Sequence, residues 1–175
     1  MLTTQTLQQI FQEIQTMGNI GCLFHIKEQF GVSLKAFQLL GFAKVIRRNI
    51  PACGKHCDKY DSCKHLDAFR ARKSRGKYKL TPKGLTLQKN LEELSDQPEK
   101  TQLFLQKNLL ANDFCKKLLQ FTEAHTKGLE ISDLVTWLLT NTKHKLFFIR
   151  IAMRDVLDLL ISLDLLKIQQ GLLMT

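Results

Sequence analysis

The sequence predicts a mainly α-helical protein with small β-hairpins, an α+β class, built from two similar units in tandem. Three observations support this prediction. Apolar residues recur at the three-to-four-residue spacing of amphipathic helices along most of the 175 residues. Two short β-prone runs stand on either side of a polar stretch in the first half. The C-terminal residues read as a hairpin that turns at Gln170-Gly171.

The first unit is expected over residues 1–97, and it begins with three helices. Residues 5–17 place one apolar stripe opposite a face rich in Gln and Glu, which predicts a helix that ends at Gly18. A second short helix precedes Gly31, and Ser33 can cap a third. A helix, a glycine turn and a capped helix together are the local plan of a helix-turn-helix.

A β-ribbon and a fourth helix complete this unit. Residues 42–48 and 77–80 predict two antiparallel strands, with Tyr78 and Leu80 on one face and the lysines on the other. Thr81 is a good N-cap and Pro82 suits the first helical position, so a helix is expected to begin there. Residues 95–99 are polar and contain a proline, which predicts the linker between the units.

The second unit is expected over residues 98–175. Apolar spacing predicts one long helix or two consecutive helices ending near Gly128, a helix capped by Ser132, and a further helix from about Leu146. From Leu91 onward the sequence contains eleven acidic and ten basic residues, so this unit is nearly neutral. A near-neutral unit gains little from a polyanion, and it is expected to contact a protein partner or a second copy of the chain instead. Six apolar residues either form an exposed strip for that contact or pack inside the unit: Phe104, Phe114, Phe121, Ile149, Met153 and Leu160.

The net charge of +10 is concentrated in one segment. Residues 44–89 contain 14 of the 26 basic side chains and three acids, whereas the rest of the chain has 12 bases and 13 acids. Such a block favours a polyanionic partner, with nucleic acid first and an anionic membrane surface second. The predicted phosphate contacts are Lys44, Arg47, Arg48, Arg70, Arg72, Lys73, Arg75, Lys77, Lys79 and Lys83. Three residues of the helix after Gly31 are candidates for base-edge or phosphate contact, with a solvated helix face as the alternative: Ser33, Lys35 and Gln38.

A cluster of Cys and His predicts a metal site within the ribbon, in an insert over residues 51–75. Four soft or borderline ligands lie within 13 residues: Cys53, Cys57, Cys63 and His65. This set suits a structural Zn²⁺ ion, and His56 could replace His65. The alternative is an iron–sulfur cluster, for which Cys22 is the nearest spare thiolate in sequence. Cys22 and Cys115 otherwise read as core thiols, because each lies in an apolar helical pattern.

Two segments resemble the wing of winged helix-turn-helix transcription regulators of the PadR and MarR groups. They are residues 39–48, Leu-Leu-Gly-Phe-Ala-Lys-Val-Ile-Arg-Arg, and residues 77–84, Lys-Tyr-Lys-Leu-Thr-Pro-Lys-Gly. The resemblance covers roughly residues 5–95, and residues 156–168 resemble the same superfamily. It implies tandem winged-helix-like units. The insert with the Cys/His cluster in the first wing departs from the PadR and MarR pattern, because ordinary wings of these groups lack it. A cysteine-bearing wing is similar to that of FeoC-type ferrous-transport regulators, where such residues are associated with an iron–sulfur cluster.

These patterns predict an intracellular protein that binds double-stranded DNA and acts in transcription regulation. No phosphate-binding glycine loop, H-E-x-x-H or G-x-S-x-G motif is present, so no enzymatic activity is expected. No apolar run approaches the roughly 20 residues of a spanning helix, and the N-terminus lacks the features of a signal peptide, so no membrane association is expected. Two alternatives are a protein-interaction adaptor of a transcription or DNA-processing complex, and an iron–sulfur redox or metal sensor.

Overall fold

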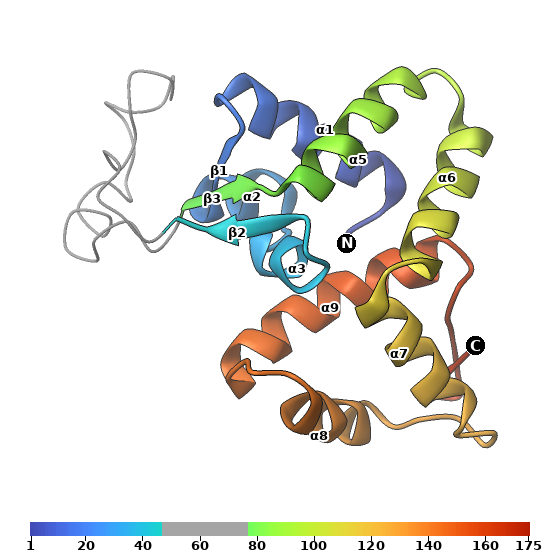
Figure 1. Cartoon of the computed structure of the whole chain (residues 1–175). Coiled ribbons are helices and arrows are strands. Elements are labelled where there is room, and N and C mark those ends of the chain that lie inside the picture. The colour runs from blue at the N-terminus through green and yellow to red at the C-terminus, as the bar shows by residue number, and fades with distance from the viewer. Residues whose placement is uncertain (47–76) are drawn as a thin grey trace.

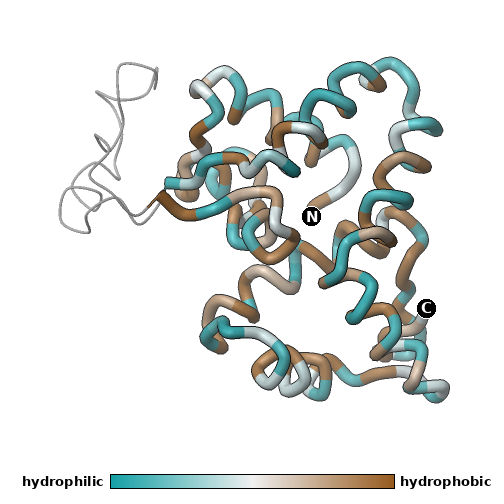
Figure 2. Tube along the Cα trace, in the orientation of Figure 1, coloured by the Kyte–Doolittle hydropathy of each residue, from teal (hydrophilic) through white to brown (hydrophobic). Residues whose placement is uncertain are grey.

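A computed structural model of the chain describes residues 1–46 and 77–175 (Figure 1). The described residues are mainly helical, with two small antiparallel sheets, which confirms the predicted α+β class. Hydrophilic and hydrophobic residues alternate around the helices (Figure 2), as expected of surface helices that bury one face. No described helix combines the length and apolar character needed to cross a membrane.

The first half contains α1 (Thr4–Thr16), β1 (Ile20–Cys22), α2 (Leu23–Phe30), α3 (Leu34–Leu39), β2 (Ala43–Val45), β3 (Lys77–Leu80) and α5 (Pro82–Glu93). Local signals set these boundaries. The Thr3 hydroxyl accepts a hydrogen bond from the Thr6 N–H at the start of α1, and Ser33 caps α3 in the same way. Gly31 ends α2 in the left-handed region, at φ +68°. The helices and caps predicted here are confirmed.

The sheet of this half has the order β1-β3-β2, and both pairings are antiparallel. The predicted ribbon of β2 and β3 is therefore confirmed, with Lys44 opposite Lys79. Strand β1 was not expected. Its central residue, Gly21, packs so close to α3 that an added Cβ would lie 2.8 Å from Leu34 Cδ1. This close approach lets β1 reach the free edge of β3.

Helix α5 is fixed to the end of the ribbon by its first turn. The Thr81 hydroxyl accepts from the Gly84 N–H and donates to the Gly41 carbonyl at 2.7 Å, and Pro82 occupies the first turn as predicted. A Cβ at Gly84 would lie 2.0 Å from the Phe42 carbonyl oxygen, so only glycine fits there.

The second half contains α6 (Pro98–Leu110), α7 (Asp113–Glu123), α8 (Ile131–Asn141), α9 (Leu146–Ser162), β4 (Lys167–Gln169) and β5 (Leu172–Met174). The two consecutive helices and the terminal hairpin are confirmed, with Gln170 and Gly171 both at positive φ in the turn. The prediction that Ser132 caps α8 was wrong, because the N-cap is Glu130. The Ser132 hydroxyl instead donates to Glu130 Oε2 at 3.1 Å.

The two halves repeat one order of elements. In the second half α7 is followed by a single bridge residue, Leu129, and then by α8, α9, β4 and β5. Leu129 pairs with Leu173 of β5, so β5 lies between Leu129 and β4 as β3 lies between β1 and β2. The order of helices and paired strands therefore recurs in the second half, while the division into two tandem winged-helix-like units stays a prediction.

Buried residues of both halves form one continuous cluster. The halves are joined mainly by the packing of α3 against α9, which lie side by side in Figure 1, and also by contacts of α1 with α6. The Asn112 side chain adds a buried hydrogen bond from its Nδ2 to the Leu40 carbonyl, at 2.8 Å. The predicted division at residues 97 and 98 stays a prediction.

The predicted apolar strip does not lie on the surface. Ile149, Met153 and Leu160 are at most 3% exposed, and the three phenylalanines of α6 and α7 are half-buried against the core. These six residues therefore pack inside the protein, which is the alternative to an exposed strip that the sequence left open. Other apolar side chains remain exposed, and four of them, from α8, α9 and β4, line one groove: Ile131, Leu139, Leu146 and Ile168.

Candidate nucleic-acid interface

The exposed lysines of the ribbon form a like-charged pair. Lys44 and Lys79 are register partners on neighbouring antiparallel strands, so their side chains leave the same face of the sheet. Both are exposed, and no carboxylate of the described residues forms an ion pair with either. Like charges that lie directly opposite each other across a strand pair destabilise a sheet. A bound polyanion would relieve this repulsion.

Two other predicted lysines lie near this pair but differ from it. Lys77, expected to project into solvent, is buried at 6% exposure. Lys83 is exposed in the first turn of α5, with its Nζ 5.6 Å from the centre of the Phe42 ring. A cation over an aromatic face can keep its hydration on the other side, so Lys83 remains available to an anion.

The remaining basic candidates lie outside the described residues. They are Arg47, Arg48, Arg70, Arg72, Lys73 and Arg75. Their segment, residues 47–76, is joined to β2 at one end and to β3 at the other. Lys44 and Lys79 therefore stand on the two strands through which the most basic segment of the chain is attached.

Two of the three polar candidates at α3, Ser33 and Lys35, contact α9. Ser33 is 3% exposed, and its N–H donates to Asp155 Oδ2 at 2.7 Å. The Lys35 Nζ lies 4.5 Å from the centre of the Phe147 ring, and burial, with Lys27 nearby, lowers the pKa of Lys35. Gln38 Oε1 is buried and accepts no hydrogen bond from the described part of the chain. Contact between Ser33 and a base edge would require α9 to move away.

The predicted metal ligands Cys53, Cys57, Cys63 and His65, with His56 as the replacement, also lie outside the described residues. Cys22 is buried at the end of β1 and is the register partner of Lys77, where residues 47–76 rejoin the sheet. Within residues 1–46 and 77–175, no group of three or more His, Cys, Asp or Glu side chains is arranged to hold a metal ion. The zinc and iron–sulfur predictions stay predictions.

Cys115 is a core thiol, as predicted. It is fully buried on α7, and burial raises the pKa of its thiol to about 12. Because the thiolate is the reactive form, we expect Cys115 to resist alkylation in the folded protein and to react at the normal rate after unfolding in denaturant. Mass spectrometry of peptides after timed iodoacetamide treatment measures this difference. Rapid labelling of native Cys115 would contradict the core assignment.

A buried carboxylate at the contact of α3 with α9 was missed by sequence reasoning. Asp155 is completely buried, and it accepts hydrogen bonds from Ser33 and from Arg154, whose Nη2 lies 3.0 Å from Asp155 Oδ1. Arg154 Nη2 also donates to the Gly31 carbonyl at 3.0 Å. Burial raises the pKa of Asp155, against the opposing effects of Ser33 and Arg154. The sequence contains one signal for this buried carboxylate, which is the position of an acidic residue among the apolar residues of α9.

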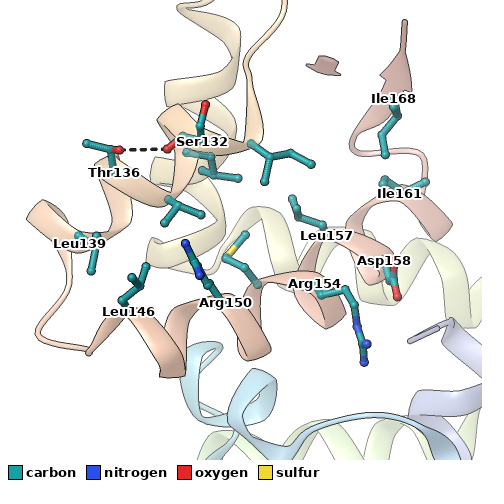
Figure 3. A pocket seen from close by; sticks show the side chains of 14 residues that line it. Ser132, Thr136, Leu139, Leu146, Arg150, Arg154, Leu157, Asp158, Ile161 and Ile168 are labelled. Carbon is teal, nitrogen blue, oxygen red and sulfur yellow. Dashed lines mark hydrogen bonds between the residues drawn. The ribbon is translucent and has the colours of Figure 1, made fainter. Parts of the chain in front are cut away.

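The second missed feature is an apolar groove between α8 and α9, with a volume of about 660 Å³ (Figure 3). Its lining combines apolar residues with polar side chains at the rim: Ile131, Ser132, Leu134, Val135, Thr136, Leu139, Leu146, Arg150, Met153, Arg154, Leu157, Asp158, Ile161 and Ile168. Apolar stripes on these helices are predicted by the sequence, but nothing in the pattern indicates that part of the stripes stays uncovered.

Comparison with known proteins gives no relative. The chain matches no protein-family model, no curated protein and no solved structure.

Proposed function

We propose that this protein binds nucleic acid, most simply double-stranded DNA, through the β2–β3 ribbon and the basic segment between its strands, and that it acts in transcription regulation. The observation that carries the proposal is the Lys44–Lys79 pair. Two cations held face to face cost stability unless an anion binds them, and these two stand at the base of a segment with a large excess of positive charge.

The order of elements supports the proposal. Helices α2 and α3 with the turn at Gly31 follow the helix-turn-helix plan, and the antiparallel ribbon comes next, as a wing would. The second half has the same order and pairing, which supports tandem winged-helix-like units. Since α3 packs against α9, the proposed interface is centred on the ribbon and not on α3. We further propose that residues 51–75 bind Zn²⁺, with an iron–sulfur cluster as the alternative.

Removing the paired lysines tests the interface. We expect Lys44→Ala combined with Lys79→Ala to weaken binding of any short DNA duplex and to lower the slope of log K against log salt by about 0.9 for each phosphate that is no longer neutralised. The free energy of unfolding should stay equal or rise slightly, because the repulsion is removed. Fluorescence anisotropy over a salt series measures the slope, and urea unfolding measures the stability.

The matched control is Lys116→Ala combined with Lys117→Ala, which removes two exposed lysines of α7. This variant should keep the salt slope of the unmodified protein. An unchanged slope in the Lys44 and Lys79 variant, or an equal reduction in both variants, would place the nucleic-acid contact elsewhere or show that only overall charge matters.

A further inference from the structure

The groove between α8 and α9 leaves large apolar side chains open to solvent. It runs from Leu139 and Leu146 at one end to Ile161 and Ile168 at the other (Figure 3). Four of its apolar lining residues are more than a third exposed: Leu146 at 38%, Leu139 at 41%, Ile131 at 51% and Ile168 at 57%. Apolar side chains gathered around one concave surface in this way mark an interaction site, because each of them loses stabilisation by facing water.

The charged residues that line this groove are two arginines and one aspartate. Arg150 is exposed on α9 and forms no ion pair with any described residue. Arg154 also lines the groove, but its guanidinium points away from it (Figure 3) and is bonded to Asp155 and to the Gly31 carbonyl, so Arg150 is the cation available to an occupant. Asp158 is the only acid among the described residues that line the groove. An occupant therefore needs an apolar face to cover the groove and negative charge along one edge to meet Arg150.

The shape of the groove favours a helix. Two helices form its walls, and α8, with 11 residues, is about 16 Å long. A partner helix of about three turns would match this length and could place apolar side chains at positions i, i+3 or i+4, and i+7 between the walls. Nucleic acid fits less well, since phosphate groups gain nothing by covering Ile131 and Leu139.

We propose that the groove between α8 and α9 binds an amphipathic helix of a partner protein, with the apolar face of that helix in the groove and an acidic edge against Arg150. This inference does not depend on the proposed binding of nucleic acid, because it uses residues remote in sequence from residues 44–89 and a different chemistry.

The test is selection and titration with the full chain. A displayed library of four-turn helices with leucine at the i, i+4 and i+7 positions and Glu, Lys or Gln at the flanking positions is selected on the protein. We expect Glu to be enriched along one edge. A selected acidic helix, labelled with fluorescein, should bind at least about tenfold more tightly than the same helix with Lys in place of Glu.

Variants locate the binding. Leu139→Glu and Arg150→Glu should each weaken binding of the acidic helix by about tenfold or more, and Arg150→Glu should improve binding of the Lys version. The matched controls are Leu103→Glu and Lys107→Glu on α6, which change an exposed leucine and an exposed lysine outside the groove and should leave binding unchanged. Emission of Trp137, the only tryptophan, checks that each variant is folded.

Several outcomes would overturn the inference. They are selection without enrichment of Glu, equal binding of the acidic and Lys helices, and equal weakening in the groove and control variants. A fourth is that Arg150→Glu weakens binding of a DNA duplex while no helix binds, which would assign this rim to nucleic acid.

Discussion

Asp155→Ala is expected to lower the free energy of unfolding by about 1–3 kcal/mol, because it leaves the buried N–H of Ser33 without an acceptor. The substitution also releases the Arg154 guanidinium, which joins α9 to the Gly31 carbonyl. Since the Arg154 side chain is 65% exposed, water can solvate it, and most of the destabilisation comes from Ser33. Urea unfolding followed by the emission of Trp137 measures the change.

The matched variant is Asp155→Asn, which keeps an oxygen that can accept from Ser33 but removes the charge. We expect it to lose less stability than Asp155→Ala. Equal destabilisation in the two variants would show that the charge of Asp155 matters more than the Ser33 hydrogen bond. No destabilisation in either variant would show that this buried contact does not hold α3 against α9.

The difference in stability between the unmodified protein and Asp155→Asn is expected to depend on pH. Burial raises the pKa of Asp155 above its ordinary value, so the folded protein binds this proton more tightly than the unfolded chain does. The unmodified protein should therefore gain stability relative to Asp155→Asn as the pH falls through the raised pKa toward 3.8, and the difference should be constant above the raised pKa. The opposite trend would mean that Arg154 and Ser33 outweigh burial and hold the pKa below 3.8.

Cys57→Ser is expected to abolish metal binding while the helices stay folded. One ligand of a four-ligand zinc site is removed, and the remaining three hold the ion far more weakly. The buried residues that pack the first half lie on α1, α2, α3, the ribbon and α5, so this core does not need the insert. Elemental analysis after gel filtration measures the zinc content, and far-UV circular dichroism measures the helices.

The control for this experiment is Cys115→Ala, which removes a thiol that lies in the core on α7. It should keep the full metal content and lose some stability instead. Full metal content in Cys57→Ser would show that the ligands are assigned wrongly. Visible absorbance with bound iron and sulfide in the unmodified protein would favour the iron–sulfur alternative over zinc.

The sequence by itself determined the elements that depend on local signals. The stripe of Leu7, Ile10, Phe11 and Ile14 predicts α1, and Thr81-Pro82 predicts the start of α5. The β2–β3 ribbon and the turn at Gln170-Gly171 follow from β-prone runs and turn chemistry. Each of these signals lies within a few residues of the feature it specifies. The excess of positive charge in residues 44–89 is likewise a property of the sequence alone.

Only the tertiary structure decided which surfaces are covered. Strand β1 and the Leu129 bridge are too short to show a periodicity, and they exist because β3 and β5 offer them an edge. The polar side of α3 looked free for a nucleic acid, but α9 covers Ser33 and supplies Asp155 as its partner. On α8 and α9, leucine and isoleucine occupy both buried positions, such as Leu138 and Ile149, and exposed positions of the groove, such as Leu139. A stripe shows that a face avoids water, while the docking of distant helices determines how much of it is covered.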